Sequence, residues 1–309
     1  MRVLVTGASG WIGSAVVPEL IDAGHEVTGL ARSEASAAAL AAVGAKVQRG
    51  DLDDLDVLAS AASASDGIIH LAFKHDLAFA GDVEGALGAN RRAIEAIGET
   101  LSGSGRPFVI PSGVLGLAPG RVATEEDGRD TEAAQGAGLG PARLAAEQAV
   151  LGLASSGVRS SAVRIAPTCH GEGDHGFMAF LVGIARAKGV SGYLGDGSNR
   201  WPAVHRYDTA RLFRLALEDA PAGSALHAVG EEGVAIRGVA EVIGRHLDVP
   251  VAAVAPEEAA EHFGFLAPFI GLDSPTSSVL TRARLGWQPA HPSLLEDLDD
   301  GSYFESLPR

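Results

Sequence analysis

The first stretch of the chain that could do chemistry is the glycine-rich segment TGASGWIG, residues 6–13. Its glycines, Gly7, Gly10 and Gly13, lie between an apolar run and a helical pattern. At this spacing the first glycine permits a sharp turn, the second lets a pyrophosphate approach the backbone, and the third allows close helix–strand packing. The helix start adds free N–H groups and a positive dipole end. The segment therefore predicts a dinucleotide-binding loop, the alternative being a tight turn without a ligand.

The end of the second predicted strand indicates which dinucleotide binds. An acidic residue there would accept the ribose hydroxyls of NAD, but the sequence reads LARS and has no carboxylate before Glu34. Arg32 is a planar, multidentate donor suited to a 2′-phosphate, and Ser33 can add a hydrogen bond. We expect NADP(H) rather than NAD(H), the alternative being a surface arginine without a ligand.

A candidate proton donor follows the fourth predicted strand, in FKHD, residues 73–76. Ligands bind at the carboxyl ends of strands in parallel sheets. His75 could donate a proton near neutral pH, Asp76 could orient it, and Lys74 could assist electrostatically. We place Lys74 and His75 in the substrate pocket, the alternative being a solvated polar loop.

The segment CHGEGDHG, residues 169–176, invites comparison with a metal site or a cysteine nucleophile. Cys169 and His170 are adjacent, and adjacency alone does not make a hydrogen-bonded catalytic pair. The Cys-His-x4-His spacing that ends at His175 lacks a fourth ligand at usual zinc spacing. We predict no metal here and place His170 in the substrate pocket.

These residues need a scaffold, and the chain alternates short apolar runs with helical patterns. Such alternation implies right-handed crossovers onto a parallel sheet. We predict a Rossmann-type doubly wound parallel α/β sheet with a small C-terminal substrate-binding cap. The expected strands cover 3–6, 25–31, 46–49, 67–72, 107–111 and 160–165, and the expected helices cover 11–23, 34–43, 55–62, 83–101 and 142–155. The dinucleotide-binding domain would comprise 1–168, with 203–229 returning to it, and the substrate-binding region 169–202 and 230–309.

The composition limits the classes of molecule that the protein is expected to bind. The formal net charge of −15 disfavours nucleic acid and anionic membrane surfaces. Cys169 is the only cysteine among 309 residues, which excludes an internal disulfide and favours a reducing compartment. We find neither a signal peptide nor a run of ~20 apolar residues. We expect a cytoplasmic protein that acts on a small molecule and binds neither nucleic acid nor a membrane.

The glycine spacing after Thr6 resembles that of extended short-chain dehydrogenases/reductases, and further motifs extend the resemblance along most of the chain. These motifs are Asp51-Leu52, HLAF (70–73), Asn90, RIAPTCHG (164–171), VHRYDTA (204–210) and LGWQP (285–289). The resemblance implies a cofactor ribose beside Ala72 and a nicotinamide bordered by the segment around Pro167. The complete predicted cofactor set is Gly7, Ser9, Gly10, Trp11, Ile12, Gly13, Arg32, Ser33, Asp51, Leu52, Leu71, Ala72, Phe73, Pro111, Arg143 and Pro167.

The chain departs from this superfamily at its catalytic pair. The superfamily uses a serine after the fifth strand and a Y-x-x-x-K pair. Ser112 matches the serine, and counting back from Glu147 puts Arg143 at the lysine position and Leu139 at the tyrosine position. No Y-x-x-x-K occurs anywhere in the sequence. The chain thus resembles an atypical group in which a basic residue and an arginine replace the tyrosine and lysine. In that group the first position is usually His, and this chain departs from it with Leu139, so its pair reads L-x-x-x-R. A structural Arg143–Glu147 pair at i,i+4 is the competing interpretation.

We interpret the chain as an NADP(H)-dependent oxidoreductase that reduces a carbonyl or imine by hydride transfer. Ser112 and Arg143 would polarise the acceptor next to Gly113, and His75 or water would supply the proton. Arg143 cannot be the donor because its pKa is too high. The alternatives are a non-catalytic NADP(H)-binding redox sensor and a sugar-nucleotide epimerase or dehydratase. A diphosphate site could use Arg186, Arg200, Arg206 and Arg237. By resemblance we expect a homodimer through the helices at 83–101 and 142–155.

Overall fold

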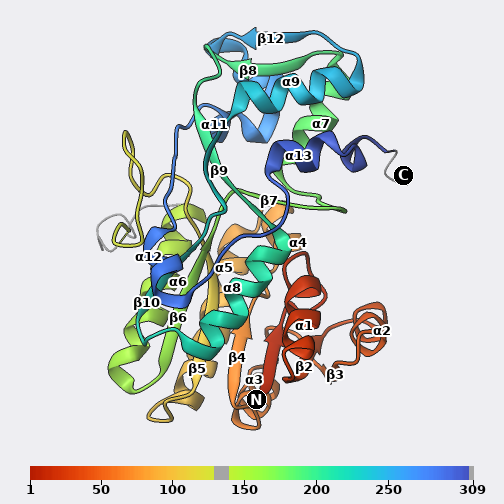
Figure 1. Cartoon of the computed structure of the whole chain (residues 1–309). Helices are drawn as coiled ribbons and strands as arrows, with labels where there is room; N and C mark the ends of the chain where they lie inside the picture. Colours follow the sequence, from red (N-terminus) through yellow and green to blue (C-terminus); the bar gives the residue numbers. More distant parts are fainter. Residues whose placement is uncertain (129–138, 306–309) are drawn as a thin grey trace.

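A seven-stranded sheet forms the lower part of the molecule (Figure 1). The computed structural model describes residues 1–128 and 139–305. The strand order is β10-β6-β5-β4-β1-β2-β3, and every neighbouring pair is parallel. Its strands are β1 (Arg2–Thr6), β2 (Glu26–Ala31), β3 (Lys46–Arg49), β4 (Gly67–His70), β5 (Pro107–Gly113), β6 (Arg159–Ile165) and β10 (Ser224–Ala228).

Helices cover both faces of this sheet, as the predicted Rossmann-type fold requires. One face packs on α1, α8 and α12, and the other packs on α3, α5 and α6. The apolar side chains of the strands are therefore buried on both sides. The helices around the sheet are α1 (Gly13–Asp22), α2 (Glu34–Ala42), α3 (Leu55–Ser63), α4 (His75–Phe79), α5 (Val83–Leu101), α6 (Leu139–Gly152), α8 (Arg206–Asp219) and α12 (Val279–Leu285), with a 3-10 turn η2 at Leu153–Ser156.

The order of the strands reverses between β1 and β4. The chain moves outward from β1 through β2 to β3 and then returns to the other side of β1 with β4. Ligands of open α/β sheets bind at such a switch point, outside the carboxyl ends of the strands. The glycine loop after β1 and the segment after β4 both lie at this point.

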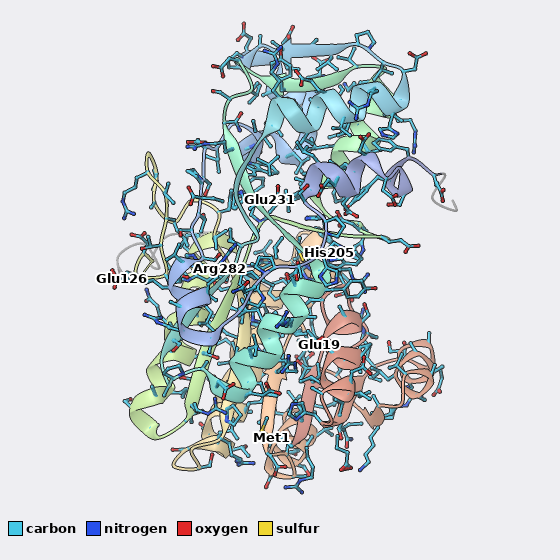
Figure 2. The ribbon with its side chains drawn as sticks, in the orientation of Figure 1. Met1, Glu19, Glu126, His205, Glu231 and Arg282 are labelled. Carbon is cyan, nitrogen blue, oxygen red and sulfur yellow. The ribbon has the colours of Figure 1, made fainter. Side chains whose placement is uncertain are left out.

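A smaller part with its own apolar core lies above the large sheet (Figure 1). It holds a three-stranded sheet of order β11-β9-β7 and the pair β12-β8. Figure 2 shows His205, the last residue of β9 and the N-cap of α8, where this part meets the large sheet. The elements are β7 (Thr168–His170), α7 (Phe177–Lys188), β8 (Ser191–Leu194), β9 (Arg200–His205), β11 (Glu231–Ala235), α9 (Ile236–Leu247), β12 (Val251–Val254), η3 (Pro256–Glu258), α10 (Ala259–Phe263), η4 (Gly264–Leu266), α11 (Ala267–Ile270), α13 (Leu294–Asp299) and η5 (Ser302–Phe304).

The strands and helices observed up to residue 165 follow the predicted ranges within a few residues, except that α4 is additional. In the region 168–202 the sequence predicts one helix, over 177–187, and the structure adds β7, β8 and β9 to α7. These strands are three to six residues long and mix polar with apolar residues, so they lack the apolar run that marks a buried strand. Within the described ranges, none of the helices has the length and hydrophobicity needed to cross a bilayer.

Candidate active site

The glycine loop is pressed against the segment that follows β4. Gly7 has φ +64°, and a Cβ built on it would lie 2.7 Å from the backbone N of Ala72. A Cβ on Gly13 would lie 2.1 Å from the carbonyl O of Gly7. Both contacts involve backbone atoms that no side-chain rotation can relieve. The two glycines therefore fit the predicted cradle, in which backbone N–H groups approach a pyrophosphate.

A buried hydrogen-bond chain holds the carboxyl ends of β1 and β4 together. The N–H of Ala72 donates to Oγ1 of Thr6 (3.2 Å), and that hydroxyl lies 2.9 Å from Nδ1 of His70. The other ring nitrogen, Nε2, lies 3.2 Å from Oδ1 of Asn90 on α5. Burial lowers the pKa of His70 to about 4, so the ring is neutral at pH 7. The Thr6 hydroxyl therefore donates to Nδ1, and Nε2–H donates to Asn90, which fixes the backbone at Ala72.

The predicted 2′-phosphate residues lie at the exposed end of β2. Ser33 caps α2 by accepting a hydrogen bond from the N–H of Ser36 (3.1 Å). Arg32 forms an exposed ion pair with Asp76 of α4, at 2.9 Å. The Asp76 carboxylate thus accepts a hydrogen bond from Arg32. No hydrogen bond between Asp76 and His75 is found among the described residues, so the predicted role of Asp76 in orienting His75 stays a prediction.

Lys74 pairs with two aspartates of the loop after β3. Its Nζ is 2.8 Å from Asp51 and 2.6 Å from Asp53, and its side chain is largely buried. These carboxylates raise the pKa of Lys74, and Lys74 in turn lowers the pKa of Asp53. The lysine therefore anchors the segment after β4 to the loop after β3, which holds Asp51 and Leu52 of the predicted cofactor set.

The residues predicted to form the reaction end of the site lie after β4, on β5 and on α6. Ser112 is buried near the end of β5, in register with Arg164 of β6. The guanidinium carbon of Arg143 lies 5.9 Å from the centre of the Phe73 ring. His75 lies edge-on to Phe73, with ring centres 5.0 Å apart. Partial burial, and then the charge of Arg143, lower the pKa of His75 below its ordinary value.

The competing interpretation, an Arg143–Glu147 pair, is wrong. Both oxygens of Glu147 accept hydrogen bonds from the fully buried Arg164, at 2.5 to 3.1 Å. Arg164 also donates to the carbonyl of Asp127 (2.7 Å). A buried charge needs such a set of partners, so Glu147 is committed to β6. Arg143 is exposed and lies over the Phe73 ring. Leu139 begins α6, and its side chain lies outside the described residues.

The remaining predicted cofactor residues lie at the same edge of the sheet, all of them in loops except Pro111. Ser9, Trp11 and Ile12 lie between β1 and α1, and Pro167 lies between β6 and β7. Leu71 follows β4, and Pro111 lies on β5 beside Ser112 and Gly113.

This arrangement can be compared with known proteins. The model of the NAD dependent epimerase/dehydratase family matches residues 3–229, about three-quarters of the chain. The chain belongs to this family. The matched range includes the glycine loop, Ser112, Arg143 and His205, where the smaller part meets the large sheet.

Two relatives and one solved structure match nearly the whole chain. A protein of Schizosaccharomyces pombe described as uncharacterised is 48% identical over 307 residues, which cover 98% of this chain and 100% of the relative. A similarly described protein of Saccharomyces cerevisiae is 47% identical over 300 residues, covering 96% and 98%. The UDP-glucose 4-epimerase of Thermus thermophilus, solved with NAD, has a TM-score of 0.72 at 20% identity and covers 99% of this chain and 100% of its own. That likeness shows the extended epimerase/dehydratase fold.

In this family member, a loop from the smaller part packs on the glycine loop. Nε1 of Trp11 donates to the carbonyl of Cys169 (3.2 Å), and the His175 ring lies edge-on to Trp11 at 5.5 Å. Arg206, at the start of α8, stacks over Trp11 at 4.2 Å and donates to Oγ of Ser14 (3.1 Å). Residues 169–176 therefore lie beside the predicted pyrophosphate site.

Two side chains of this loop are committed to structural contacts. Burial raises the pKa of the Cys169 thiol to about 12, so the reactive thiolate is scarce at neutral pH. His170 is buried, with Nδ1 2.8 Å from Oδ2 of Asp297, which ties the loop to α13. Its assignment to the substrate pocket stays a prediction. Over the ranges 1–128 and 139–305, no group of three metal-ligating side chains could hold an ion.

A tyrosine near the end of the described chain fastens the same loop. The buried Tyr303 hydroxyl accepts from the N–H of Gly171 (3.2 Å) and donates to Oδ2 of Asp174 (2.9 Å). Oδ1 of Asp174 accepts from the N–H of Gly176 (2.6 Å) at the start of α7. Sequence reasoning missed this contact, because it joins residues about 130 positions apart without a motif.

We expect Tyr303→Phe to destabilise the protein by about 1–2 kcal/mol, because it leaves the Gly171 N–H and the Asp174 carboxylate short of a partner while buried. Loosening of the loop beside Trp11 should also weaken dinucleotide binding severalfold. Urea unfolding and a cofactor titration measure the two effects. Tyr193→Phe, on β8, is the matched control. Unchanged unfolding and binding in Tyr303→Phe would contradict this role.

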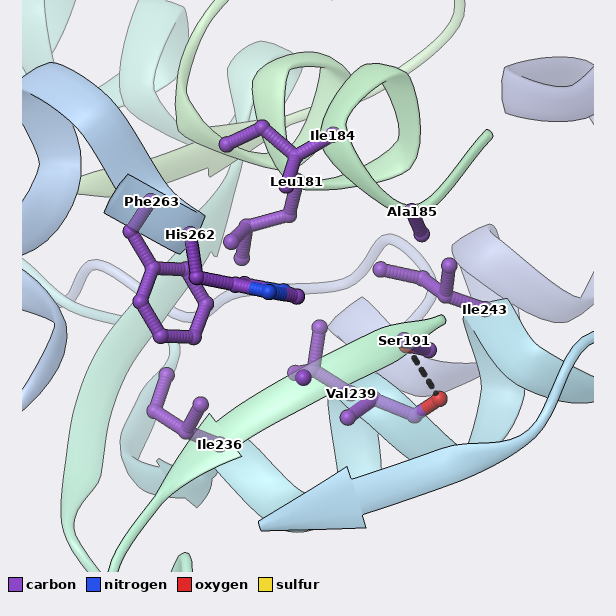
Figure 3. Close-up of a pocket in the computed structure, with 11 residues that line it drawn as sticks. Leu181, Ile184, Ala185, Ser191, Ile236, Val239, Ile243, His262 and Phe263 are labelled. Atoms are coloured by element: carbon purple, nitrogen blue, oxygen red, sulfur yellow. Dashed lines mark hydrogen bonds between the residues drawn. The ribbon is translucent and has the colours of Figure 1, made fainter. Parts of the chain in front are cut away.

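Figure 3 shows a separate cavity inside the smaller part, between α7, β8, α9 and α10. Its walls are mainly aliphatic, and Ser191 is occupied by a hydrogen bond to the carbonyl of Ala240 (2.8 Å). The His262 ring points into this space, and its Nε2 is buried without a described partner. The cavity is lined by none of the predicted catalytic residues, so we do not assign the reaction to it.

Proposed function

We propose that this protein is an NADP(H)-dependent oxidoreductase that reduces a carbonyl or imine of a small organic substrate without the usual tyrosine–lysine pair. The observation that supports this proposal is the ion pair of Glu147 with Arg164, which leaves the Arg143 guanidinium over the Phe73 ring. A fixed cation at the lysine position can still stabilise negative charge on a reacting oxygen.

In the proposed reaction, Ser112, Arg143 and His75 have different roles. When bound, the reduced nicotinamide supplies a hydride to the carbonyl carbon, and the C=O electron pair moves onto oxygen. Ser112 donates a hydrogen bond to that oxygen, and Arg143 holds the nicotinamide ribose and stabilises the developing alkoxide. The imidazolium of His75, or a water molecule, then gives the alkoxide its proton.

The proposed binding of the 2′-phosphate by Arg32 predicts a preference for NADPH over NADH. We expect Arg32→Ala to raise the Kd for NADPH about tenfold, because an arginine–phosphate hydrogen bond of about 1.5–3 kcal/mol is lost. The Kd for NADH should change little. Titrations read by energy transfer from Trp11 to the nicotinamide measure both values.

Asp76→Asn is the matched control for Arg32. It removes the carboxylate that pairs with Arg32 at 2.9 Å, so the guanidinium is released and like-charge repulsion of a phosphate falls. We expect tighter NADPH binding in this variant. Equal affinity of the native protein for NADPH and NADH would contradict the assignment.

The lowered pKa of His75 predicts the pH dependence of reduction. A histidine that donates the proton must be protonated, so kcat should be highest below its pKa and fall about tenfold per pH unit above it. Because partial burial and Arg143 lower this pKa, the fall should begin below the ordinary value of 6.5. His75→Phe should abolish this dependence, and an unchanged pH profile in that variant would remove His75 as the acid.

The comparisons favour one further candidate, a sugar-nucleotide epimerase or dehydratase, because the family description and the Thermus structure name such enzymes. We rank it second because such enzymes rely on the tyrosine that Leu139 replaces. A redox sensor that binds NADP(H) without turnover also fits the missing tyrosine. The domain division, the homodimer through α5 and α6 and the cytoplasmic location stay predictions.

A further inference from the structure

Four phenylalanines form an aromatic patch in the smaller part: Phe177, Phe180, Phe265 and Phe269. Phe180 and Phe265 contact each other edge-on, with ring centres 4.7 Å apart, and they are 43% and 51% exposed. Phe177 stacks on Phe269 at 6.0 Å and lies 6.4 Å from Phe265. Exposed neighbouring rings of this kind mark a surface that binds an apolar group.

Two segments connect the aromatic patch with the predicted cofactor site. Phe177 follows Gly176 directly, and the preceding His175 lies against Trp11 of the glycine loop. From the other side, Leu115 comes three residues after Ser112 and packs on the same apolar core as Phe177 and Phe269. Two segments that reach the predicted cofactor therefore lead into the patch.

The arginines that a nucleotide diphosphate would need are already engaged. Arg200 makes two hydrogen bonds to Asp273 (3.1 and 3.0 Å), and Arg237 pairs with Glu241 (2.9 Å). Both pairs are exposed, as the Arg32–Asp76 pair is, so a phosphate would have to compete with the paired carboxylate in each case.

The other two arginines have backbone and stacking contacts. Arg186 donates to the carbonyl of Phe304 (3.0 Å). Arg206 stacks over Trp11 and donates to Ser14 and to the carbonyl of Glu172. The chain as a whole carries a formal charge of −15, which further disfavours an anionic substrate.

We propose that the aromatic patch is the acceptor half of the substrate site and that the substrate is a neutral carbonyl or imine compound with an aromatic group. This inference rests on the proposed reductase function. The aromatic group would lie on Phe180 and Phe265, and the C=O or C=N bond would reach Ser112 and Arg143. Burying a ring removes apolar surface from water, whereas a charged substituent there would lose hydration without a free cation.

Matched aldehydes test the substrate class. We compare 2-naphthaldehyde with 4-carboxybenzaldehyde, which adds a charge to an aromatic ring, and with glyceraldehyde, which is small and polar. We expect kcat/KM for 2-naphthaldehyde to exceed the other two values by about tenfold or more, as a hydrophobic pocket discriminates by roughly 10–200-fold per methylene-sized group.

Variants test the location. Phe180→Ala and Phe265→Ala should each lower kcat/KM for 2-naphthaldehyde by about tenfold and leave that for glyceraldehyde within about twofold, because each variant removes apolar surface that only the aromatic substrate would bury. Val279→Ala is the control, since Val279 is a 66% exposed apolar residue on α12, away from the patch. Its kinetic constants should not change.

The outcomes separate this inference from the reductase proposal. A higher kcat/KM for glyceraldehyde or 4-carboxybenzaldehyde would overturn the proposed role of the aromatic patch, and so would unchanged kcat/KM in both phenylalanine variants. Either result would leave the reductase proposal intact. NADPH binding without turnover of any aldehyde would overturn the reductase. The patch is then tested by binding of 2-naphthamide to the NADP⁺-loaded protein. Binding that Phe265→Ala weakens about tenfold supports the patch, and no binding, or competition by UDP-glucose alone, contradicts it.

Discussion

Gly13→Ala will raise the Kd for NADPH by about 100-fold or more, a loss of about 2.8 kcal/mol of binding free energy. The added methyl group would lie 2.1 Å from the Gly7 carbonyl O and 2.7 Å from the carbonyl carbon of Ala8. Since both neighbours are backbone atoms, the loop must shift and the N–H groups that face the pyrophosphate move with it. Isothermal titration with NADPH measures the change.

Gly24→Ala provides the matched control. Gly24 follows the end of α1 with φ +85°, but a Cβ there meets nothing within 4 Å. This variant should lose about 1 kcal/mol of stability from left-handed strain and keep its affinity for NADPH. If Gly13→Ala melts like the native protein and binds NADPH within about threefold of it, the glycine loop is not the pyrophosphate site.

Arg143→Ala will lower kcat for aldehyde reduction by about 100-fold, the cost typical of removing one donor to a developing oxyanion. The side chain is exposed and lies over Phe73, and Glu147 does not compete for it. The effect should therefore appear mainly in kcat, with a smaller rise in the Kd for NADPH from the lost ribose contact. Single-turnover kinetics with saturating NADPH separate the two.

Two variants distinguish catalysis from bulk electrostatics. Arg143→Lys restores the residue that the superfamily has at this position and should recover about tenfold or more of the lost kcat. Arg91→Ala removes an exposed cation on α5 that pairs with Glu95, and it should leave kcat unchanged. Full turnover by Arg143→Ala would remove Arg143 from the catalytic machinery.

The large sheet was predictable because its signals are local. Buried parallel strands such as β4 read as continuous apolar runs, and the helices between them carry a 3.6-residue period. The glycine loop was predictable for the same reason, since three glycines at fixed spacing report the backbone geometry they permit. The short strands β7 and β8 were not predictable, because their partners are distant and their side chains are mixed.

Side-chain contacts between elements that are distant along the chain could not be predicted from the sequence. Whether Arg143 pairs with Glu147 depends on Arg164, which only the pairing of β5 with β6 and the packing of α6 bring near. Lys74 is a second example. Its place after a strand predicted that it lies at the carboxyl edge of the sheet, but it did not predict that the side chain turns toward Asp51 and Asp53. Charged side chains are long, so their partners are decided by tertiary structure.

The most direct test of the reductase proposal follows the hydride. NADPH deuterated at C4 of the dihydropyridine ring, in each of its two stereoisomers, is incubated with the protein and 2-naphthaldehyde, and the alcohol is analysed by mass spectrometry. We predict one deuterium on the carbinol carbon from one stereoisomer only, with one NADP⁺ formed per alcohol. Tight NADPH binding without labelled product from 2-naphthaldehyde or from a panel of ketones, other aldehydes and imines would contradict a reductase and indicate a cofactor-binding protein without turnover.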